Sequence, residues 1–250
     1  MYISDKDHLF YSKLEDGISL CYTRQKPYFF SFMSERRQAM ARDFLENQYF
    51  SSYSFWGGYN LAERKLLGLF FDDTFNNEMF PVSALEFKYR KCDELSHRDF
   101  LGALMSLGIE RETVGDILVD NGRTVVFLKS EIKNYVVSQI FKIGNIGVTI
   151  SDANILKLPA GNKTEELSFI VSSMRIDNIV AAICSLSREK TKALILSGNV
   201  SVNFLENKNV SFNLRSGDKI VIRGKGKYIL NNILGTTKKG RIKISVVHFR

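Results

Sequence analysis

A group of side chains able to bind an anion lies around Ser187. It is followed by Arg188, Lys190 and Lys192, and the sequence REKTKALILS, ended by Gly198, predicts a helix that Ser187 caps. Free backbone N–H groups and the positive end of the helix dipole favour a phosphate at such a start. Arg188 adds a planar donor fork, and Lys192 adds a charge one turn further on. The spacing therefore predicts a helix start that binds phosphate.

More basic residues follow towards the end of the chain. Three of them flank Gly224 and Gly226 in a predicted loop that can follow a phosphate backbone: Arg223, Lys225 and Lys227. Four others extend the basic surface: Lys238, Lys239, Arg241 and Lys243. Residues 173–250 carry 15 Lys+Arg against four Asp+Glu, a net charge of +11, whereas residues 1–172 carry −3. This asymmetry indicates a polyanionic partner for the last third of the chain.

Sequence signatures of catalysis are missing. There is no GxxxxGK[ST] phosphate loop and no GxGxxG that opens a helix. The histidines (His8, His97, His248) and cysteines (Cys21, Cys92, Cys184) are too dispersed to indicate a triad, a metal site or a disulfide framework. Asp177 is interpreted as a structural partner of a nearby N–H group or arginine. We therefore expect no catalytic residue, no metal and no cofactor.

Composition points to a folded, multi-domain protein. The chain has 250 residues, of which 44% are hydrophobic and 25% charged. No run approaches the ~18 apolar residues of a membrane span, and the first ten residues, MYISDKDHLF, do not look like a secretory signal. We expect a cytoplasmic, monomeric protein with reduced thiols and no membrane partner.

The first segment, residues 1–77, is predicted to be a mixed, mainly helical domain. One helix is expected near residues 5–24, and a second begins after Ser34 and carries Met40, Phe44 and Leu45 at helical spacing. Asn60 is expected to cap a third, which carries Leu61, Leu66, Leu67 and Phe70. The aromatic stretch at residues 55–59 (FWGGY) is either a contact surface or, the preferred interpretation, part of the core.

The second segment, residues 78–160, predicts the order β-α-β-β-α-β of a ferredoxin-like domain. Leu85, Phe87 and Tyr89 alternate with polar residues as in a half-buried strand. Ser96 starts a helix with Asp99 in a capping box, and the DNG turn at 120–122 joins two strands, 115–119 and 123–128. A helix from Ser130, with Ile132, Val136, Val137 and Ile140 on one face, and a strand at 146–150 complete it. RNA-recognition motifs share this topology but stack bases on several strand aromatics; here the third strand carries only Phe127, which argues against stacking on this sheet.

The third segment, residues 174–250, follows a predicted linker at 152–172. A short amphipathic helix at 175–184 precedes the helix that Ser187 caps. Strands are then expected at 200–204, 219–223 and 240–249, with a turn at Gly217-Asp218.

This segment resembles the S4 RNA-binding domain. The resemblance covers about residues 174–230 and rests on matched positions in register: Arg175-Ile176-Asp177, Ser187-Arg188, Leu194-Ile195, Gly198, Val200, Val202-Asn203 and Gly217-Asp218. Thr191 stands where alanine is usual, and Phe204 where a glycine often follows the asparagine. The resemblance implies an RNA-binding domain and adds Arg175 and Asn203 to the expected RNA-binding residues.

Nearly the whole chain resembles the YlmH family of bacterial S4 proteins. The matched segments are FWGGY (55–59) with AER (62–64), HRDFLGALMSLGIERETVGDI (97–117), RGKGKY (223–228) and TKKGRIKI (237–244). This resemblance implies a non-catalytic protein that binds rRNA or tRNA on the large ribosomal subunit and assists the rescue of stalled ribosomes that carry peptidyl-tRNA. Lys225 and Lys227 stand where aromatic and arginine residues are common.

Two other functions stay open. S4 domains are often appended to enzymes, so an RNA-modifying active site within residues 1–160 is one alternative. The other is a protein adaptor, for example in cell division, which uses the aromatic stretch at 55–59 and binds RNA only secondarily.

Overall fold

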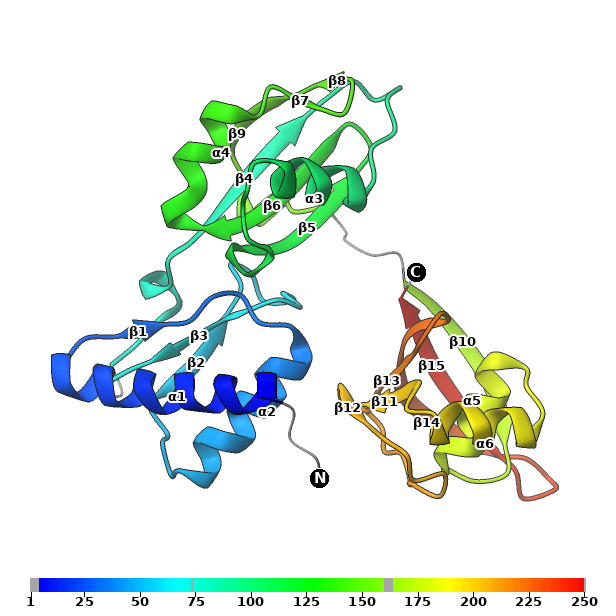
Figure 1. Cartoon of the computed structure of the whole chain (residues 1–250). Coiled ribbons are helices and arrows are strands. Elements are labelled where there is room, and N and C mark those ends of the chain that lie inside the picture. The colour runs from blue at the N-terminus through cyan, green and yellow to red at the C-terminus, as the bar shows by residue number, and fades with distance from the viewer. Residues whose placement is uncertain (1–4, 73, 160–163, 250) are drawn as a thin grey trace. The chain divides into compact units, whose positions relative to one another are not determined.

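A computed structural model describes residues 5–72, 74–159 and 164–249 (Figure 1). The chain divides into two compact units, residues 1–161 and 162–250, which are described separately.

The first part of unit 1 combines two helices with a small sheet. Ser34 caps α2 by accepting a hydrogen bond from the Arg37 backbone N–H, which confirms that predicted helix start. The helices pack on the sheet through a buried apolar cluster that includes Leu14, Leu45 and Leu67. The bounds are α1 Asp5–Arg24, β1 Tyr28–Phe29, α2 Glu35–Asn47, β2 Tyr53–Trp56 and β3 Leu66–Leu69, with strand order β1-β3-β2.

The helix expected after Asn60 is wrong. Leu66 and Leu67 lie in β3, the central strand, and are fully buried, as is Phe70. Leu61 is 84% exposed. A short apolar run buried on both sides does not distinguish a strand from a buried helix by its periodicity. The described part of residues 1–77 therefore combines two helices, which make up most of its regular structure, with a small three-stranded sheet.

The second part of unit 1 follows the predicted β-α-β-β-α-β order in β4, α3, β5, β6, α4 and β9. The antiparallel sheet has the order β5-β6-β4-β9. Ser96 and Asp99 form the predicted capping box, and residues 120–122 form the predicted turn. The bounds are β4 Val82–Lys88, α3 His97–Ser106, β5 Val114–Asp120, β6 Arg123–Lys129, α4 Lys133–Gln139, β7 Lys142–Ile143, β8 Ile146–Gly147 and β9 Thr149–Asp152, with 3-10 turns at Asn77–Met79, Arg111–Thr113, Ser130–Ile132 and Ile155–Lys157.

The single strand expected at residues 146–150 is two strands. β8 pairs with β7 in a separate hairpin, and β9 pairs with β4. Between them the Val148 N–H still donates to the Phe141 carbonyl at 3.0 Å, so the chain changes partners at this residue. The helix expected from Ser130 begins as a 3-10 turn before α4, and Val137 is 40% exposed rather than on the buried face.

Both faces of this four-stranded sheet are covered. One face packs on α3 and α4 through a cluster that includes Phe87, Phe100 and Val136. The other packs on the first part of the unit through Phe127, Val125 and Leu66. Phe127 is fully buried and stacks on Tyr59 with ring centroids 4.8 Å apart. This burial agrees with the expectation that the sheet does not stack RNA bases.

Unit 2 is a six-stranded antiparallel sheet with two helices on one face (Figure 1). Ile179 and Val180 of α5 and Ile195 of α6 pack in one cluster with Leu230 and Ile244 of the sheet. The bounds are β10 Thr164–Val171, α5 Ile176–Cys184, α6 Arg188–Leu196, β11 Val200–Val202, β12 Leu205–Glu206, β13 Lys219–Ile222, β14 Gly226–Thr236 and β15 Ile242–Phe249, in the sheet order β10-β15-β14-β13-β11-β12.

The linker predicted at residues 152–172 is wrong over most of its described length. β9 includes Asp152, and β10 pairs with β15 along all eight of its residues; residues 160–163 lie outside the described residues. Exposed residues of β10 alternate with partly or fully buried ones because one face of the strand packs on the core. The strand expected at 200–204 ends at Val202, and Gly226 and Lys227 belong to β14 rather than to a loop.

Candidate nucleic-acid interface

The start of α6 presents its basic side chains to solvent, as the sequence predicts. The Ser187 hydroxyl accepts a hydrogen bond from the Lys190 N–H at 3.4 Å and so caps the helix. Arg188, Lys190 and Lys192 are exposed, while Thr191 and Ile195 face the core. Thr191, which replaces the usual alanine, donates to the Ser187 carbonyl at 3.0 Å. The helix therefore separates a buried apolar face from an exposed cationic one.

The turn between β13 and β14 lies beside the connection from α6 to β11. The Arg223 N–H donates to the Asn199 carbonyl, three residues past the end of α6, at 2.9 Å. Burial raises the pKa of Cys184, the last residue of α5, and the nearby Lys225 ammonium partly offsets that rise. Arg223 and Lys225 are both exposed. This part of unit 2 thus gathers cations from α6 and from the β13–β14 turn, with Arg188 four residues beyond Cys184.

The second basic group lies at the other end of β14, in the turn to β15. Lys238, Lys239 and Arg241 belong to the turn that connects β14 to β15, and all three are exposed. β14 has 11 residues, so at a rise of ~3.3 Å per residue the two turns are about 30 Å apart. The structure does not bring these residues together with Arg223 and Lys225.

Two further predicted lysines lie on the sheet face that points away from the helices. Lys243 alternates along β15 with the buried Ile244, and Lys227 alternates along β14 with the buried Tyr228. The Lys227 ammonium lies 5.5 Å from the ring centroid of Phe204 and 4.9 Å from that of Phe249. The rings therefore hold this lysine by cation–π attraction.

Arg175 and Asn203 have structural partners. Arg175 forms a two-pronged ion pair with Asp177, at 3.0 and 2.8 Å, and Asp177 is only 5% exposed. This confirms the structural role expected for Asp177. The Asn203 side chain donates to Asp218 at 2.9 Å and accepts from the Lys219 N–H at 3.0 Å, which fixes the β11–β12 turn. That either residue contacts RNA stays a prediction.

The FWGGY and AER segments meet in unit 1 around Asp116 of β5. Its carboxylate accepts hydrogen bonds from the Tyr59 hydroxyl at 2.9 Å and from the N–H groups of Glu63 and Arg64 at 2.7 and 3.0 Å. Burial, with the Asp116 carboxylate alongside, raises the pKa of Tyr59 far above its ordinary value. The sequence analysis missed Asp116, whose partners are more than 50 residues away. The preferred core interpretation fits the stretch at 55–59, whose three aromatics pack into two buried clusters.

Arg64 is partly buried at the same junction. Its guanidinium donates to the carbonyls of Val114, Phe32 and Arg111 at 3.0, 3.1 and 3.3 Å. Burial, assisted by the nearby Arg111 charge, lowers the pKa of Arg64 to about 10. These contacts tie the AER segment to both parts of unit 1, so its role here is structural.

The described residues contain neither a cluster of metal ligands nor a helix suited to span a membrane. Within 5–72, 74–159 and 164–249, no three His, Cys, Asp or Glu side chains gather closely enough to hold a metal ion. In the same ranges, none of the helices has the length and hydropathy needed to span a membrane.

Comparison with known proteins identifies the class of protein to which the chain belongs. Residues 76–157 match a family model described as the putative RNA-binding domain in YlmH. The chain is 32% identical over 196 residues to the ribosome-associated protein quality control protein P2 of Bacillus subtilis (strain 168), across 77% of this chain and 76% of that protein. The chain belongs to the YlmH family.

A solved structure shares the fold. The cell division protein ylmH from Streptococcus pneumoniae superimposes with a TM-score of 0.54 at 21% identity, over 62% of this chain and 96% of that chain.

Proposed function

We propose that the chain is a non-catalytic RNA-binding protein whose residues 174–250 form an S4 domain that binds structured rRNA or tRNA. The observation that carries the proposal is the exposed, capped start of α6 with Arg188, Lys190 and Lys192, next to Lys225 at one end of the sheet. Such an end offers a helix dipole, an arginine fork and several ammonium groups to a phosphate backbone. The match of residues 76–157 to a putative RNA-binding domain supports the same class of ligand.

The ribosome is the proposed location of that RNA. The relative from Bacillus subtilis is named a ribosome-associated quality control protein. We extend that role to this chain: it acts in the cytoplasm, as a monomer without a cofactor, on large subunits that carry peptidyl-tRNA after stalling. In this arrangement the middle domain has the ferredoxin-like fold, and unit 1 contributes through shape and specific contacts, because its bulk charge is near neutral.

We infer the absence of catalysis because the residues that resemble catalytic groups have structural roles. Asp177 is occupied by Arg175, Asp99 closes the capping box of α3, and Ser187 caps α6. Mass spectrometry of rRNA incubated with the protein tests the competing enzyme hypothesis. A new modified base that depends on the protein would establish it.

Removing two charges from α6 tests the RNA site. Arg188→Ala with Lys192→Ala should weaken tRNA binding and reduce the slope of log K against log[salt] by about 1.5–2, because two phosphate contacts are lost. The matched control, Arg24→Ala with Lys26→Ala, removes the same charge from unit 1 and should leave the slope unchanged. Wild-type slope and affinity in the α6 variant would exclude this helix from the site.

Sedimentation of a cell lysate tests the ribosomal part separately. The protein should co-migrate with the free large subunit in a low-salt sucrose gradient. Recovery only at the top of the gradient would contradict that part.

A further inference from the structure

The usual RNA surface of a β-α-β-β-α-β domain is closed in this chain. Phe127, the one aromatic on the third strand, has no exposed surface and lies under Tyr59. A Cβ on Gly58 would stand 2.4 Å from the Phe127 ring, which shows how closely the first part of unit 1 covers the sheet. Any base recognised by this domain must therefore be bound away from the sheet.

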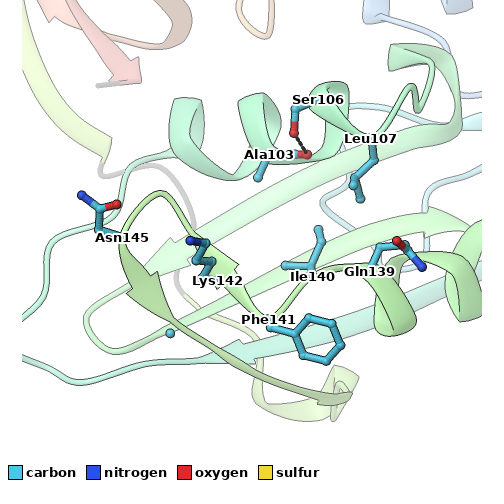
Figure 2. A pocket seen from close by; sticks show the side chains of 9 residues that line it. Ala103, Ser106, Leu107, Gln139, Ile140, Phe141, Lys142 and Asn145 are labelled. Atoms are coloured by element: carbon cyan, nitrogen blue, oxygen red, sulfur yellow. Dashed lines mark hydrogen bonds between the residues drawn. The ribbon is translucent and has the colours of Figure 1, made fainter.

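A cavity of about 570 Å³ lies on the helical side of the same domain. It is bounded by the end of α3 and by residues 139–147, which form the end of α4 and the β7–β8 hairpin (Figure 2). Ala103, Leu107 and Ile140 provide its apolar lining. Its volume is within the range of small-ligand sites.

Phe141 is the aromatic residue of this cavity, and its side chain is 72% exposed. Its backbone is nevertheless fixed, because Ile140 and Ile143 on either side are 5% and 1% exposed and its carbonyl accepts the Val148 N–H. A large apolar ring held in solvent forgoes the free energy of burial. It is therefore available, without rearrangement of the backbone, to a partner that stacks on it.

The other side chains that line the cavity carry hydrogen-bonding and charged groups that complement those of a nucleotide. Lys142 is the one charged residue among the nine that line the cavity, and no carboxylate is among them. Gln139 and Asn145 add carboxamides, which can both donate to and accept from a base edge. An aromatic ring, a carboxamide and an ammonium group are the groups that bind an unstacked base and its phosphate in single-stranded RNA.

We propose that this cavity binds one unstacked base of an RNA loop, with Phe141 as the stacking platform and Lys142 on the adjacent phosphate. The inference rests on the proposed RNA-binding function and adds to it a second contact, on unit 1, that recognises single-stranded rather than helical RNA.

Two labelled RNAs test the cavity on the full-length protein: a stem-loop, and a duplex of the same stem without the loop. Phe141→Ala should lower affinity for the stem-loop about 5- to 150-fold, the range for one stacked base, and leave duplex binding unchanged. The salt slope should not change, because no charge is removed. Phe141→Tyr should retain binding, and Tyr49→Ala, which removes an aromatic that is 95% exposed elsewhere in unit 1, should have no effect.

Two outcomes would contradict, respectively, the cavity proposal and the proposed RNA-binding function. If Phe141→Ala binds the stem-loop with wild-type affinity while Arg188→Ala with Lys192→Ala weakens the binding of both RNAs, the cavity proposal is overturned. The S4 site would then still stand, and a protein segment would be favoured as the occupant of the cavity. Failure of the wild-type chain to bind either RNA would overturn the proposed function itself.

Discussion

The Tyr59 hydroxyl donates a 2.9 Å hydrogen bond to the carboxylate of Asp116, and this contact joins the two parts of unit 1. The same carboxylate accepts two backbone N–H groups of the AER segment and is only 8% exposed. The signature that identifies the family in sequence is thus the structural junction of its first unit.

Removing the carboxylate should destabilise unit 1 strongly. Asp116→Ala leaves three part-buried donors without their acceptor and should lower the free energy of unfolding by about 3 kcal/mol, whereas Tyr59→Phe should lower it by about 1 kcal/mol. Urea titration followed by the fluorescence of Trp56, the single tryptophan, reports on this unit. Tyr49→Phe, on a side chain that is 95% exposed, is the control. Equal midpoints for all variants would show that the junction is not stabilising.

Gly58 should be intolerant of a side chain for two separable reasons. Its φ of +98° disfavours other residues, and an added Cβ would meet the Phe127 ring at 2.4 Å. Gly108 has a φ of +76° but open space around its Cβ position. Gly108→Ala should therefore lower the free energy of unfolding by about 1–2 kcal/mol through backbone strain alone. Gly58→Ala should lower it by about 1–3 kcal/mol more, because the added Cβ also meets the ring. Equal losses in the same Trp56 assay would contradict the close packing.

Phe204 holds a backbone conformation that favours glycine. Asn203 and Phe204 have φ of +49° and +67° in the two-residue turn between β11 and β12, a conformation that glycine adopts without strain. Phe204→Gly should be more stable than Phe204→Ala by about 1 kcal/mol, because both lose the lysine contacts but only alanine keeps the strain.

Hydrogen exchange of the β11 and β13 amides measures this difference. The order should reverse at Phe212, which lacks a positive φ: there the glycine variant should be the less stable one. The same order at both positions would refute the strain argument.

The two basic turns at the ends of β14, one from β13 and one to β15, should contribute independently to RNA binding. They are about 30 Å apart, well beyond the screening length of ~8–10 Å at physiological salt. Arg223→Ala with Lys225→Ala, and Lys238→Ala with Lys239→Ala, should each reduce the salt slope of tRNA binding, and the combined variant should show the sum. Binding unaffected by the Lys238/Lys239 change would confine the site to the α6 end.

Local signals in the sequence were sufficient for three helix starts, although not for the one expected at Asn60, and for one face of the site. Ser34, Ser96 and Ser187 mark their helices because a cap depends only on residues within one turn. The exposure of Arg188 and Lys192 follows from the same helix. These features needed no knowledge of distant parts of the chain.

Long-range pairing was not predictable from the same signals. The residues of β10 give the local signals of a linker because the partner strand, β15, lies more than 70 residues further on. The separation of Lys225 from Lys238 depends on the length of β14, and the burial of Phe127 depends on Tyr59. Phe141 was missed because an aromatic residue next to a helix end gives no local sign of its exposure.

The pairing of β10 with β15 also fixes an order of events during synthesis. The strand that opens unit 2 is translated long before its partner, so the six-stranded sheet cannot close until residues 242–249 have left the ribosome. Unit 1 contains all of its own strand partners and can fold while the remainder is still being made. The strongly basic unit is therefore the later of the two to acquire its structure, because its sheet needs a strand from the far end of the unit.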